Sequence, residues 1–280
     1  MHKSKFRELA ANRDFISGIY NYCDRWCERC PFATRCLVYA TEREADADPE
    51  SRDITNAKFW SRLEKIFQEA HEMIQEWAEE AGVDLETIET ETALSDREQQ
   101  RLDAKQHELS LSARRYAEMV QRWFEDEFAV EHNVHDDTTG KSKSTEDDID
   151  VSDAIEVIRW YQFFVAAKVF RALMARDCPV IDVDLSSDDI FSDAELEDDE
   201  APIEALGDNA DGSAKIALIA IDRSSSAWRV MQGSLPEKAE SIVQILLVLE
   251  RLRRAVEQTF PNARDFIRPG FDEVISDFVS

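Results

Sequence analysis

Glycine and proline are scarce in this sequence, which has seven of each among its 280 residues. Both residues interrupt regular structure, and here they leave long stretches whose apolar residues recur with the 3.6-residue period of a helix. An all-helical protein is therefore expected. The sequence also lacks a glycine-rich phosphate loop, a Ser/His/Asp arrangement and a nucleophile elbow, so it offers no motif of those enzyme classes.

Long hydrophobic runs are also absent. The first residues, "MHKSKFRELAANRDF", are polar and contain no apolar core of a secretory signal. The most apolar stretch, "VIRWYQFFVAAKVFRALM", is short for a bilayer span, and four polar residues break it: Arg159, Gln162, Lys168 and Arg171. We therefore expect no membrane span and a cytoplasmic protein.

The sequence has few positively charged residues. The chain has 33 lysines and arginines against 60 aspartates and glutamates, for a net charge of −27. Such a surface repels nucleic-acid phosphates and anionic lipids, and it favours a protein partner, in particular a basic one. Only ten of the basic residues are lysine. Acidic, lysine-poor surfaces fit a high-salt habitat and a solvated acidic face equally, and the oligomeric state stays open.

Five long helices are expected from the apolar spacing and the stop and start signals. The first follows Trp60 to Trp77, with Gly82 as its stop, and the second opens at the capping box Ser95–Glu98 and runs to Phe124. The others cover 152–174, 215–231 and 240–260, the last of them after Pro236. The expected fold is an all-α helical bundle with a cysteine-rich, metal-binding helical segment at the N-terminus.

Acidic spacers separate these helices at 83–94, 136–150 and 183–213. The third is long, poor in apolar residues and densely negative, so we expect a flexible, solvated insertion, with an acidic interaction segment as the alternative. The resulting organisation is a four-cysteine segment at 1–45 and a helical bundle at 46–280. No boundary is strong enough to separate them into independent domains, so one composite domain is expected.

Four of the five cysteines lie within "CDRWCERCPFATRC", at Cys23, Cys27, Cys30 and Cys36. In a reducing compartment such a cluster indicates a metal or redox site in preference to a disulfide framework. One buried cysteine is usually a small hydrophobic residue, and Cys178 is interpreted in that way. Four within fourteen positions are not explained by core packing.

The spacing suggests how these cysteines hold a metal. Cys23, Cys27 and Cys30 stand at i, i+4 and i+7, on one face if the segment is helical, and Pro31 would then turn the chain toward Cys36. Three thiolates on such a face span roughly 10 Å, whereas zinc needs all its sulfurs about 2.3 Å from one atom. A multi-iron cluster fits the span with less bending. An iron–sulfur cluster is preferred, with zinc and free thiols as alternatives.

The segment "CERCPFATRCLVYA" resembles the C-x2-C-P-x4-C-L-x-Y-A segment of WhiB-like proteins, bacterial regulators that hold a [4Fe-4S] cluster. The resemblance covers residues 23–40. It implies a [4Fe-4S] cluster with Cys27, Cys30 and Cys36 as ligands, and Cys23 in the place of the fourth cysteine. The regulatory role of that family is not carried over.

Other candidate residues have less specific patterns. His132 and His135 lie beside Glu131 at the expected end of a helix, where a divalent-ion site or a solvated helix end fits. The Glu-x-x-His pairs of di-iron bundles are absent from the expected core helices. Charged residues interrupt two apolar helices, where they form structural ion pairs or line a pocket: Glu156, Arg159, Lys168, Asp222 and Arg223.

The sequence leaves two functions open. In the first, a [4Fe-4S] cluster on the four cysteines transfers electrons or senses oxidants. In the second, zinc or a cluster is a structural staple for a protein-interaction module without redox activity. An enzyme that uses the charged residues of the helices is a third class, for which the sequence indicates no substrate.

Overall fold

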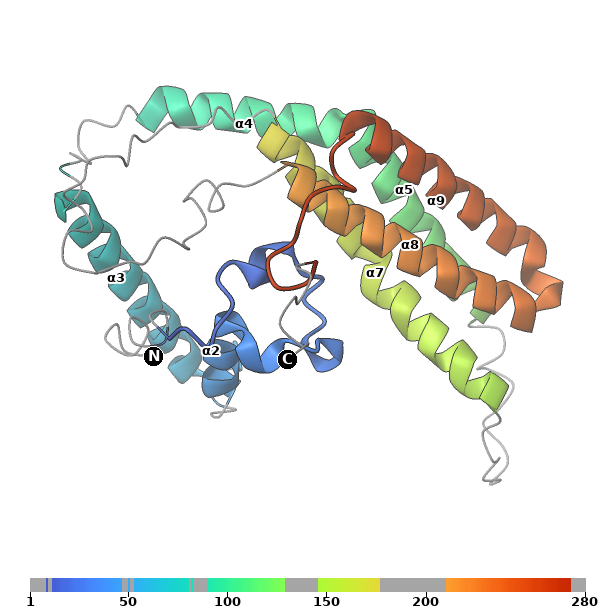
Figure 1. The fold of residues 1–280 in the computed structure, drawn as a ribbon, viewed down its shortest axis with the longest axis horizontal. Helices are drawn as coiled ribbons and strands as arrows, with labels where there is room; N and C mark the ends of the chain where they lie inside the picture. The colour runs from blue at the N-terminus through green and yellow to red at the C-terminus, as the bar shows by residue number, and fades with distance from the viewer. Residues whose placement is uncertain are drawn as a thin grey trace, which may run out of the picture. The chain divides into compact units, whose positions relative to one another are not determined.

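The computed structural model describes residues 9, 12–46, 50, 53–80, 82, 90–128, 146–176 and 210–272 (Figure 1). Across these residues it contains seven α-helices and no β-strand, so the expected all-α class is confirmed. Contacts divide the chain into two compact units. The described residues of the first come from Met1–Ser95 and Arg268–Ser280, and those of the second from Asp96–Pro179 and Asp208–Ile267. The predicted organisation into 1–45 and 46–280 stays a prediction.

The helices have the following bounds. The first unit contains α2 (Leu37–Asp46) and α3 (Ala57–Glu80), and α4 (Thr90–Gln106) runs from the first unit into the second. The second unit contains α5 (Glu108–Trp123), a π-helical turn (Phe124–Phe128), α7 (Glu146–Arg176), α8 (Ala210–Ser234), a 3₁₀ turn (Pro236–Lys238) and α9 (Ala239–Thr259).

Four of these helices form a bundle in the second unit. In it α7 packs against α8 and α5, and α9 packs against the same two helices from the other side (Figure 1). The α7–α8 contact is the most extensive. Helix α8 buries several small residues, which allow a neighbouring helix to pack closely against it: Gly212, Ser213, Ala214, Ala217 and Ala220.

Large aromatic residues fill the centre of the bundle. Trp228 of α8 is fully buried, and its ring meets that of Trp123 of α5 edge-on, with the centroids 5.0 Å apart. The Trp123 indole Nε1 donates a hydrogen bond to Ser241 Oγ of α9 over 3.0 Å. These contacts join α5, α8 and α9, and burial of each aromatic ring removes about 150–250 Å² from water.

The second expected helix is two helices, so that prediction was wrong in its bounds. Helix α4 begins at Thr90, which places Ser95 inside the helix and not at its start. His107 interrupts the run with an extended ψ of 140°, and its Nδ1 accepts a hydrogen bond from Leu109 N over 3.2 Å. This histidine is the N-cap of a new helix, because its side chain satisfies a backbone donor that the first turn leaves unpaired.

All three expected acidic spacers are shorter than predicted. Helix α4 already begins at Thr90, α7 at Glu146 and α8 at Ala210, so 90–94, 146–150 and 210–213 are helical. The remainder of the three spacers lies outside the described residues. Helix α2 was not expected from the sequence.

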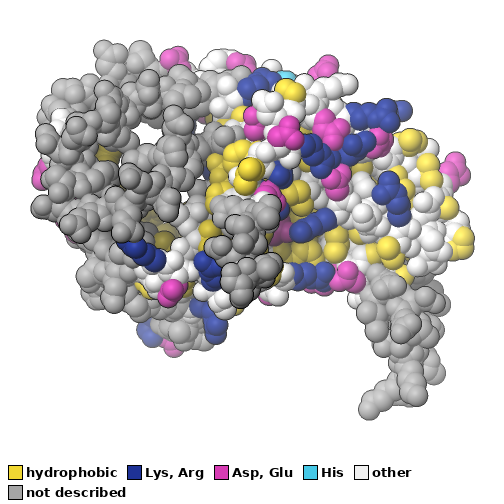
Figure 2. Space-filling model, in the orientation of Figure 1, with side chains coloured by type: hydrophobic (Ala, Val, Ile, Leu, Met, Phe, Trp, Pro, Cys, Tyr) yellow, Lys and Arg dark blue, Asp and Glu magenta, His cyan; other side chains and the backbone are white. Residues whose placement is uncertain are grey.

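Charged side chains are scattered over the visible face of the bundle (Figure 2). Figure 2 shows basic and acidic groups interspersed there, with apolar side chains between them. This arrangement is typical of a solvated helical surface. Among the described helices, none combines the length and the hydropathy that crossing a membrane requires.

Candidate metal centre

The cysteine segment consists of three short 3₁₀ turns, Ile19–Tyr22, Cys27–Arg29 and Ala33–Arg35. A cysteine ends each turn: Cys23, Cys30 and Cys36 are its C-terminal caps, all with extended backbone. Cys27 is the first residue of the second turn. The chain therefore folds back after each turn and delivers four thiols to one region.

The α-helix expected over the first three cysteines is not formed, so that prediction was wrong. Gly18 and Arg25 both lie in the left-handed region, with φ of 68° and 60°, and no α-helix continues through such residues. Cys30 precedes Pro31, which disfavours the α conformation for the residue before it. The spacing i, i+4, i+7 therefore comes from successive turns and not from one helical face.

Buried aromatic and aliphatic residues anchor these turns. Ile19, Tyr22 and Trp26 are each at most 6% exposed. Asp24 Oδ1 accepts a hydrogen bond from Trp26 N over 3.2 Å, an Asx turn that fixes the loop before the second 3₁₀ turn. The Ile16 N–H donates to the Arg35 carbonyl over 3.0 Å and ties the two ends of the segment together.

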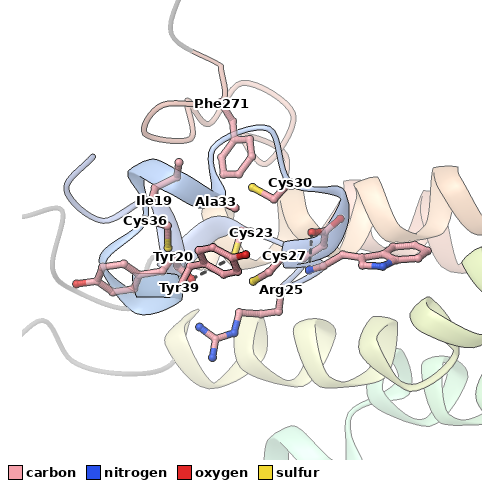
Figure 3. Close-up of a pocket in the computed structure, with 12 residues that line it drawn as sticks. Ile19, Tyr20, Cys23, Arg25, Cys27, Cys30, Ala33, Cys36, Tyr39 and Phe271 are labelled. Carbon is pink, nitrogen blue, oxygen red and sulfur yellow. Dashed lines mark hydrogen bonds between the residues drawn. The ribbon is translucent and has the colours of Figure 1, made fainter. Parts of the chain in front are cut away.

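All four cysteines line one hollow in the first unit (Figure 3). The hollow is partly open to solvent, and the space between its lining residues amounts to about 300 Å³ with the solvent-open part included. Each cysteine is partly buried and none forms a disulfide. Its wall also contains several apolar or aromatic side chains: Ile19, Tyr20, Trp26, Ala33, Tyr39 and Phe271. The structure thus brings together the four residues that the sequence singled out.

The four thiols line one hollow, but their arrangement is not that of a metal site. In the described part of the chain, no group of three or more His, Cys, Asp or Glu side chains is arranged to hold a metal ion. A tetrahedral zinc site needs four sulfurs about 2.3 Å from its centre. The helical face on which the expected separation of the thiols depended is not formed, so the preference for a cluster over zinc stays a prediction.

The hollow disfavours charge on a free thiol. The pKa of Cys27 is raised to about 11, first because burial penalises the thiolate and then because Glu42 lies nearby, with Arg25 acting in the opposite direction. Arg25 is itself paired with Glu42 over 3.1 Å. The free Cys27 thiol is therefore protonated at neutral pH, and binding of a metal group there releases its proton.

The C-terminal part of the described chain forms one wall of the hollow. Phe271 lines it and meets the ring of Phe32 edge-on at 5.2 Å. Arg268 pairs with Asp272 over 2.8 Å and lies 4.7 Å from the centroid of the Phe271 ring, which fixes this turn. The sequence analysis missed Phe271. The one available signal was the Pro-Gly pair before it, which marks a turn.

Gly270 allows this wall to close. Its φ is 73°, and a Cβ there would lie 2.9 Å from Ile16 Cδ1 and 3.2 Å from Ile19 Cδ1. Gly18 has a similar φ of 68°, but a Cβ there would meet only ordinary contacts, at 3.8 Å or more. Replacing either glycine by alanine would therefore strain the backbone. Only at Gly270 would the added methyl group also overlap neighbouring side chains.

We expect Gly270→Ala to open the hollow. Gly18→Ala should cost about 1–2 kcal/mol from the left-handed backbone alone. Gly270→Ala should cost about 1–3 kcal/mol more, because the new methyl group overlaps Ile16. Thiol modification by a chromogenic disulfide should be faster in Gly270→Ala than in Gly18→Ala. Equal modification rates and equal melting temperatures in the two variants would contradict this account.

The charged residues of the bundle helices do not share one site. Arg223 donates a hydrogen bond to the Tyr161 hydroxyl over 2.6 Å, while the Lys168 ammonium lies 5.3 Å from the Phe164 ring centroid. The Arg159 guanidinium lies 4.3 Å from the Phe124 ring centroid, and Glu156 is exposed. His132, His135 and Cys178 lie outside the described residues.

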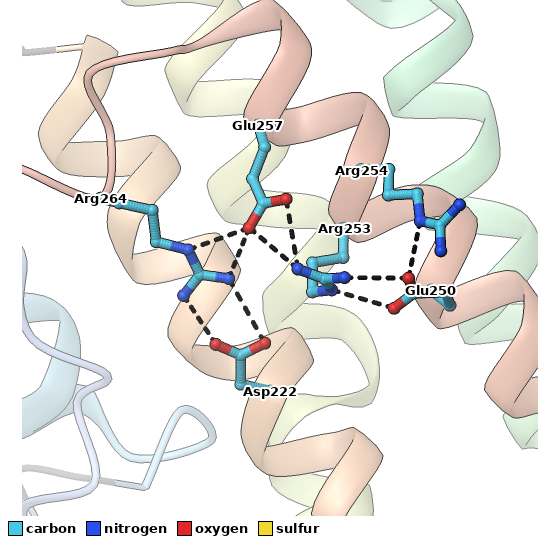
Figure 4. A network of polar contacts seen from close by, with 6 residues as sticks. All are labelled: Asp222, Glu250, Arg253, Arg254, Glu257 and Arg264. Atoms are coloured by element: carbon cyan, nitrogen blue, oxygen red, sulfur yellow. Dashed lines mark hydrogen bonds and ion pairs between the residues drawn. The ribbon is translucent and has the colours of Figure 1, made fainter.

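Asp222 belongs to an ion-pair network on the bundle surface (Figure 4). Arg264 pairs with Asp222 over 2.7 Å and also pairs with Glu257 of α9. Arg253 in turn pairs with both Glu257 and Glu250. Hydrogen bonds from Arg253 and Arg254 lower the pKa of Glu250 from 4.5 to about 2. The ionised Glu250 carboxylate therefore stabilises the folded state above pH 4.5, and this stabilisation is lost as the pH falls through about 2. This network is structural, and it links α8 to α9.

Comparison with known protein families, curated proteins and solved structures finds no match to this chain. The resemblance of residues 23–40 to WhiB-like proteins stays a prediction. The function is therefore inferred from the geometry and chemistry of the cysteine hollow.

Proposed function

We propose that Cys23, Cys27, Cys30 and Cys36 bind a [4Fe-4S] cluster and that the protein transfers electrons or senses oxidants through it. One observation carries this proposal: four thiols from three successive turns line the same hollow. Thiolate quartets are the usual ligands of such clusters. The raised pKa of Cys27 does not oppose ligation, because coordination to iron displaces the thiol proton.

The choice of a cluster over a single zinc ion rests on the resemblance of residues 23–40 to the cysteine segment of WhiB-like proteins. A structural zinc site would instead draw the four thiolates to one centre. When bound, the cluster would supply reversible one-electron chemistry. The alternative of a purely structural metal staple becomes an outcome of the test below.

The chain's own residues would tune and protect the bound group. Tyr39 and Phe271 form apolar walls of the hollow, which limits the access of water and oxidants to the ligands. Arg25, Arg29 and Arg35 lie in the same segment as the thiolates, and their positive charge offsets that of a group with four thiolate ligands. Arg25 is also held close to the hollow by its pair with Glu42.

The redox partner in this proposal is a basic protein. A chain with a net charge of −27 attracts a positively charged surface and speeds its encounter, an effect that salt weakens. The same charge repels nucleic acid and anionic lipid, so a protein is the preferred partner.

Anaerobic purification of the full chain tests the proposal. We expect a brown protein with broad visible absorption that dithionite bleaches and a mild oxidant restores. Chemical analysis should find iron and acid-labile sulfide in equal amounts, about four of each per chain. The reduced protein should give the electron paramagnetic resonance signal of a cluster with an unpaired electron.

Two outcomes would contradict the proposal in different ways. A colourless protein with about one zinc per chain would replace the cluster by a structural zinc site. A brown protein that dithionite does not bleach would retain the cluster and remove the redox role. Far-UV circular dichroism before and after metal removal then measures how much of the helical structure depends on the metal.

A further inference from the structure

Helix α3 (Ala57–Glu80) carries the apolar pattern of a coiled-coil helix. Its apolar residues follow one another at alternating spacings of three and four, a seam made up of Trp60, Leu63, Phe67, Ala70, Ile74 and Trp77. Ile66 and Met73 lie beside this seam and widen it. A strict alternation of this kind repeats every seven residues and fits a second helix packed along the first.

This seam is exposed to solvent. Trp60, Phe67 and Trp77 are 54%, 66% and 49% exposed, and Ile66 and Ile74 are also about half exposed. No described element packs extensively along α3. The Trp60 Nε1–H already donates to the Ile54 carbonyl over 2.9 Å, so its remaining exposed surface is apolar ring. Apolar surface of this extent on one helix indicates an interaction site.

The order of side chains along the seam identifies the partner. Read from either end, the seam begins with a tryptophan, continues with Leu63 or Ile74, and has Phe67 and Ala70 at its middle. If a second α3 runs antiparallel to the first, Trp60 faces Trp77, Leu63 faces Ile74, and the large Phe67 faces the small Ala70. The pairing is self-complementary, as a two-fold interface between identical chains requires.

The distribution of charge along α3 also favours an antiparallel pair. The first half of α3 carries Lys58, Arg62 and Lys65, with a single acid at Glu64. The second half carries only acidic charges, at Glu69, Glu72, Glu76, Glu79 and Glu80. An antiparallel pair sets the basic half of each helix beside the acidic half of the other, within the roughly 10 Å over which charges act at 0.1 M salt. A parallel pair would set like charges side by side.

We propose that α3 is a homodimerisation helix that pairs antiparallel with α3 of a second copy of the chain. With about 150–250 Å² per aromatic side chain, the exposed parts of the three aromatic residues alone offer roughly 250–420 Å² per copy. Ile66 and Ile74 add to this, so the interface falls at the lower end of specific interfaces. The dimer is accordingly concentration-dependent, with a dissociation constant in the micromolar range.

Sedimentation equilibrium of the full chain tests the pairing. We expect a dimer that dissociates on dilution, and Phe67→Glu should weaken it by at least about 100-fold, because it buries two charges at the centre of the seam. Phe163→Glu is the matched control: Phe163 lies on α7 of the other unit and is 63% exposed, against 66% for Phe67. It should leave the association unchanged.

Three results would overturn the proposal. The wild type could remain monomeric up to roughly 100 μM, or Phe67→Glu could associate as the wild type does. Loss of the dimer in Phe163→Glu alone would move the interface to α7. Since Phe67 is an exposed residue, circular dichroism should show both variants folded, and Ile74→Glu provides a second variant in the same seam.

The direction of the pair is measured separately. Spin labels attached through a non-natural amino acid at Ser61 should lie about 22 Å apart along an antiparallel pair, and labels at Gln68 nearly opposite each other. A parallel pair would bring the labels close together at both positions, and that result would overturn the antiparallel arrangement. Neither measurement depends on the metal, so failure of the dimer and failure of the cluster are distinguishable.

Discussion

Cys23→Ala is expected to lower the iron retained after exposure to air by at least about tenfold, because the proposed cluster uses the four thiols as one ligand set and loss of one opens a metal to solvent. Cys23 is the informative choice, since the resemblance to WhiB-like proteins defines the other three ligands better. Its Sγ also lies 3.5 Å from the Tyr20 carbonyl, to which the thiol donates. Metal analysis and visible spectra before and after exposure to air measure the effect.

Two further variants separate ligation from folding. Cys23→Ser keeps a donor for the Tyr20 carbonyl and removes the thiolate, so it should lose the metal as Cys23→Ala does. Cys178→Ala, outside the four-cysteine segment, should keep its metal and cost about 1 kcal/mol or less. Full metal retention in Cys23→Ala with loss in Cys178→Ala would mean that Cys178 is the fourth ligand.

Trp228→Ala should destabilise the bundle by about 3–5 kcal/mol, the range for truncating a buried tryptophan. Trp228 is fully buried on α8 and packs edge-on against Trp123, so its removal leaves a cavity between α5 and α8. A typical domain is stable by only about 5–15 kcal/mol, which makes this a large share of the total. Urea unfolding followed by far-UV circular dichroism provides the measurement.

Trp160→Ala is the matched control for this effect. Trp160 lies on α7 of the same bundle but is 37% exposed, so its truncation should cost clearly less than that of Trp228. Similar losses in the two variants would contradict the assignment of Trp228 to the centre of the core. Equal stability of Trp228→Ala and the wild type would contradict it more directly.

Much of the helical fold is predictable from the sequence. The expected helices at 60–77, 152–174, 215–231 and 240–260 lie within or close to α3, α7, α8 and α9. Their apolar periods are long and contain few breaking residues, so local pattern and final structure agree. The break at His107 was not predictable in this way, because a capping histidine leaves the apolar period of the flanking helices intact.

The site was predictable in its composition and not in its geometry. The spacing of the four cysteines indicated a common site, and the structure places them around one hollow. The same spacing fits an α-helical face and a series of 3₁₀ turns. The left-handed backbone of Arg25 interrupts an α-helix, so the segment forms turns. A non-glycine residue in that conformation leaves no sequence signal. Likewise, the pattern of α3 predicted an amphipathic helix but not that its apolar face would be exposed.

The wall formed by Phe271 has a consequence for the order in which the site is made. The four cysteines leave the ribosome before the helices of the bundle, and Phe271 follows Cys36 by 235 residues. At about 5–20 residues per second, the hollow lacks this wall for roughly 12–47 s of each round of synthesis. During that interval the thiols are accessible from the side that the Arg268–Asp272 turn later covers. Under the proposed function, a metal group can therefore reach the thiols of the nascent chain before the hollow closes, because the helices of the bundle are synthesised between these two events.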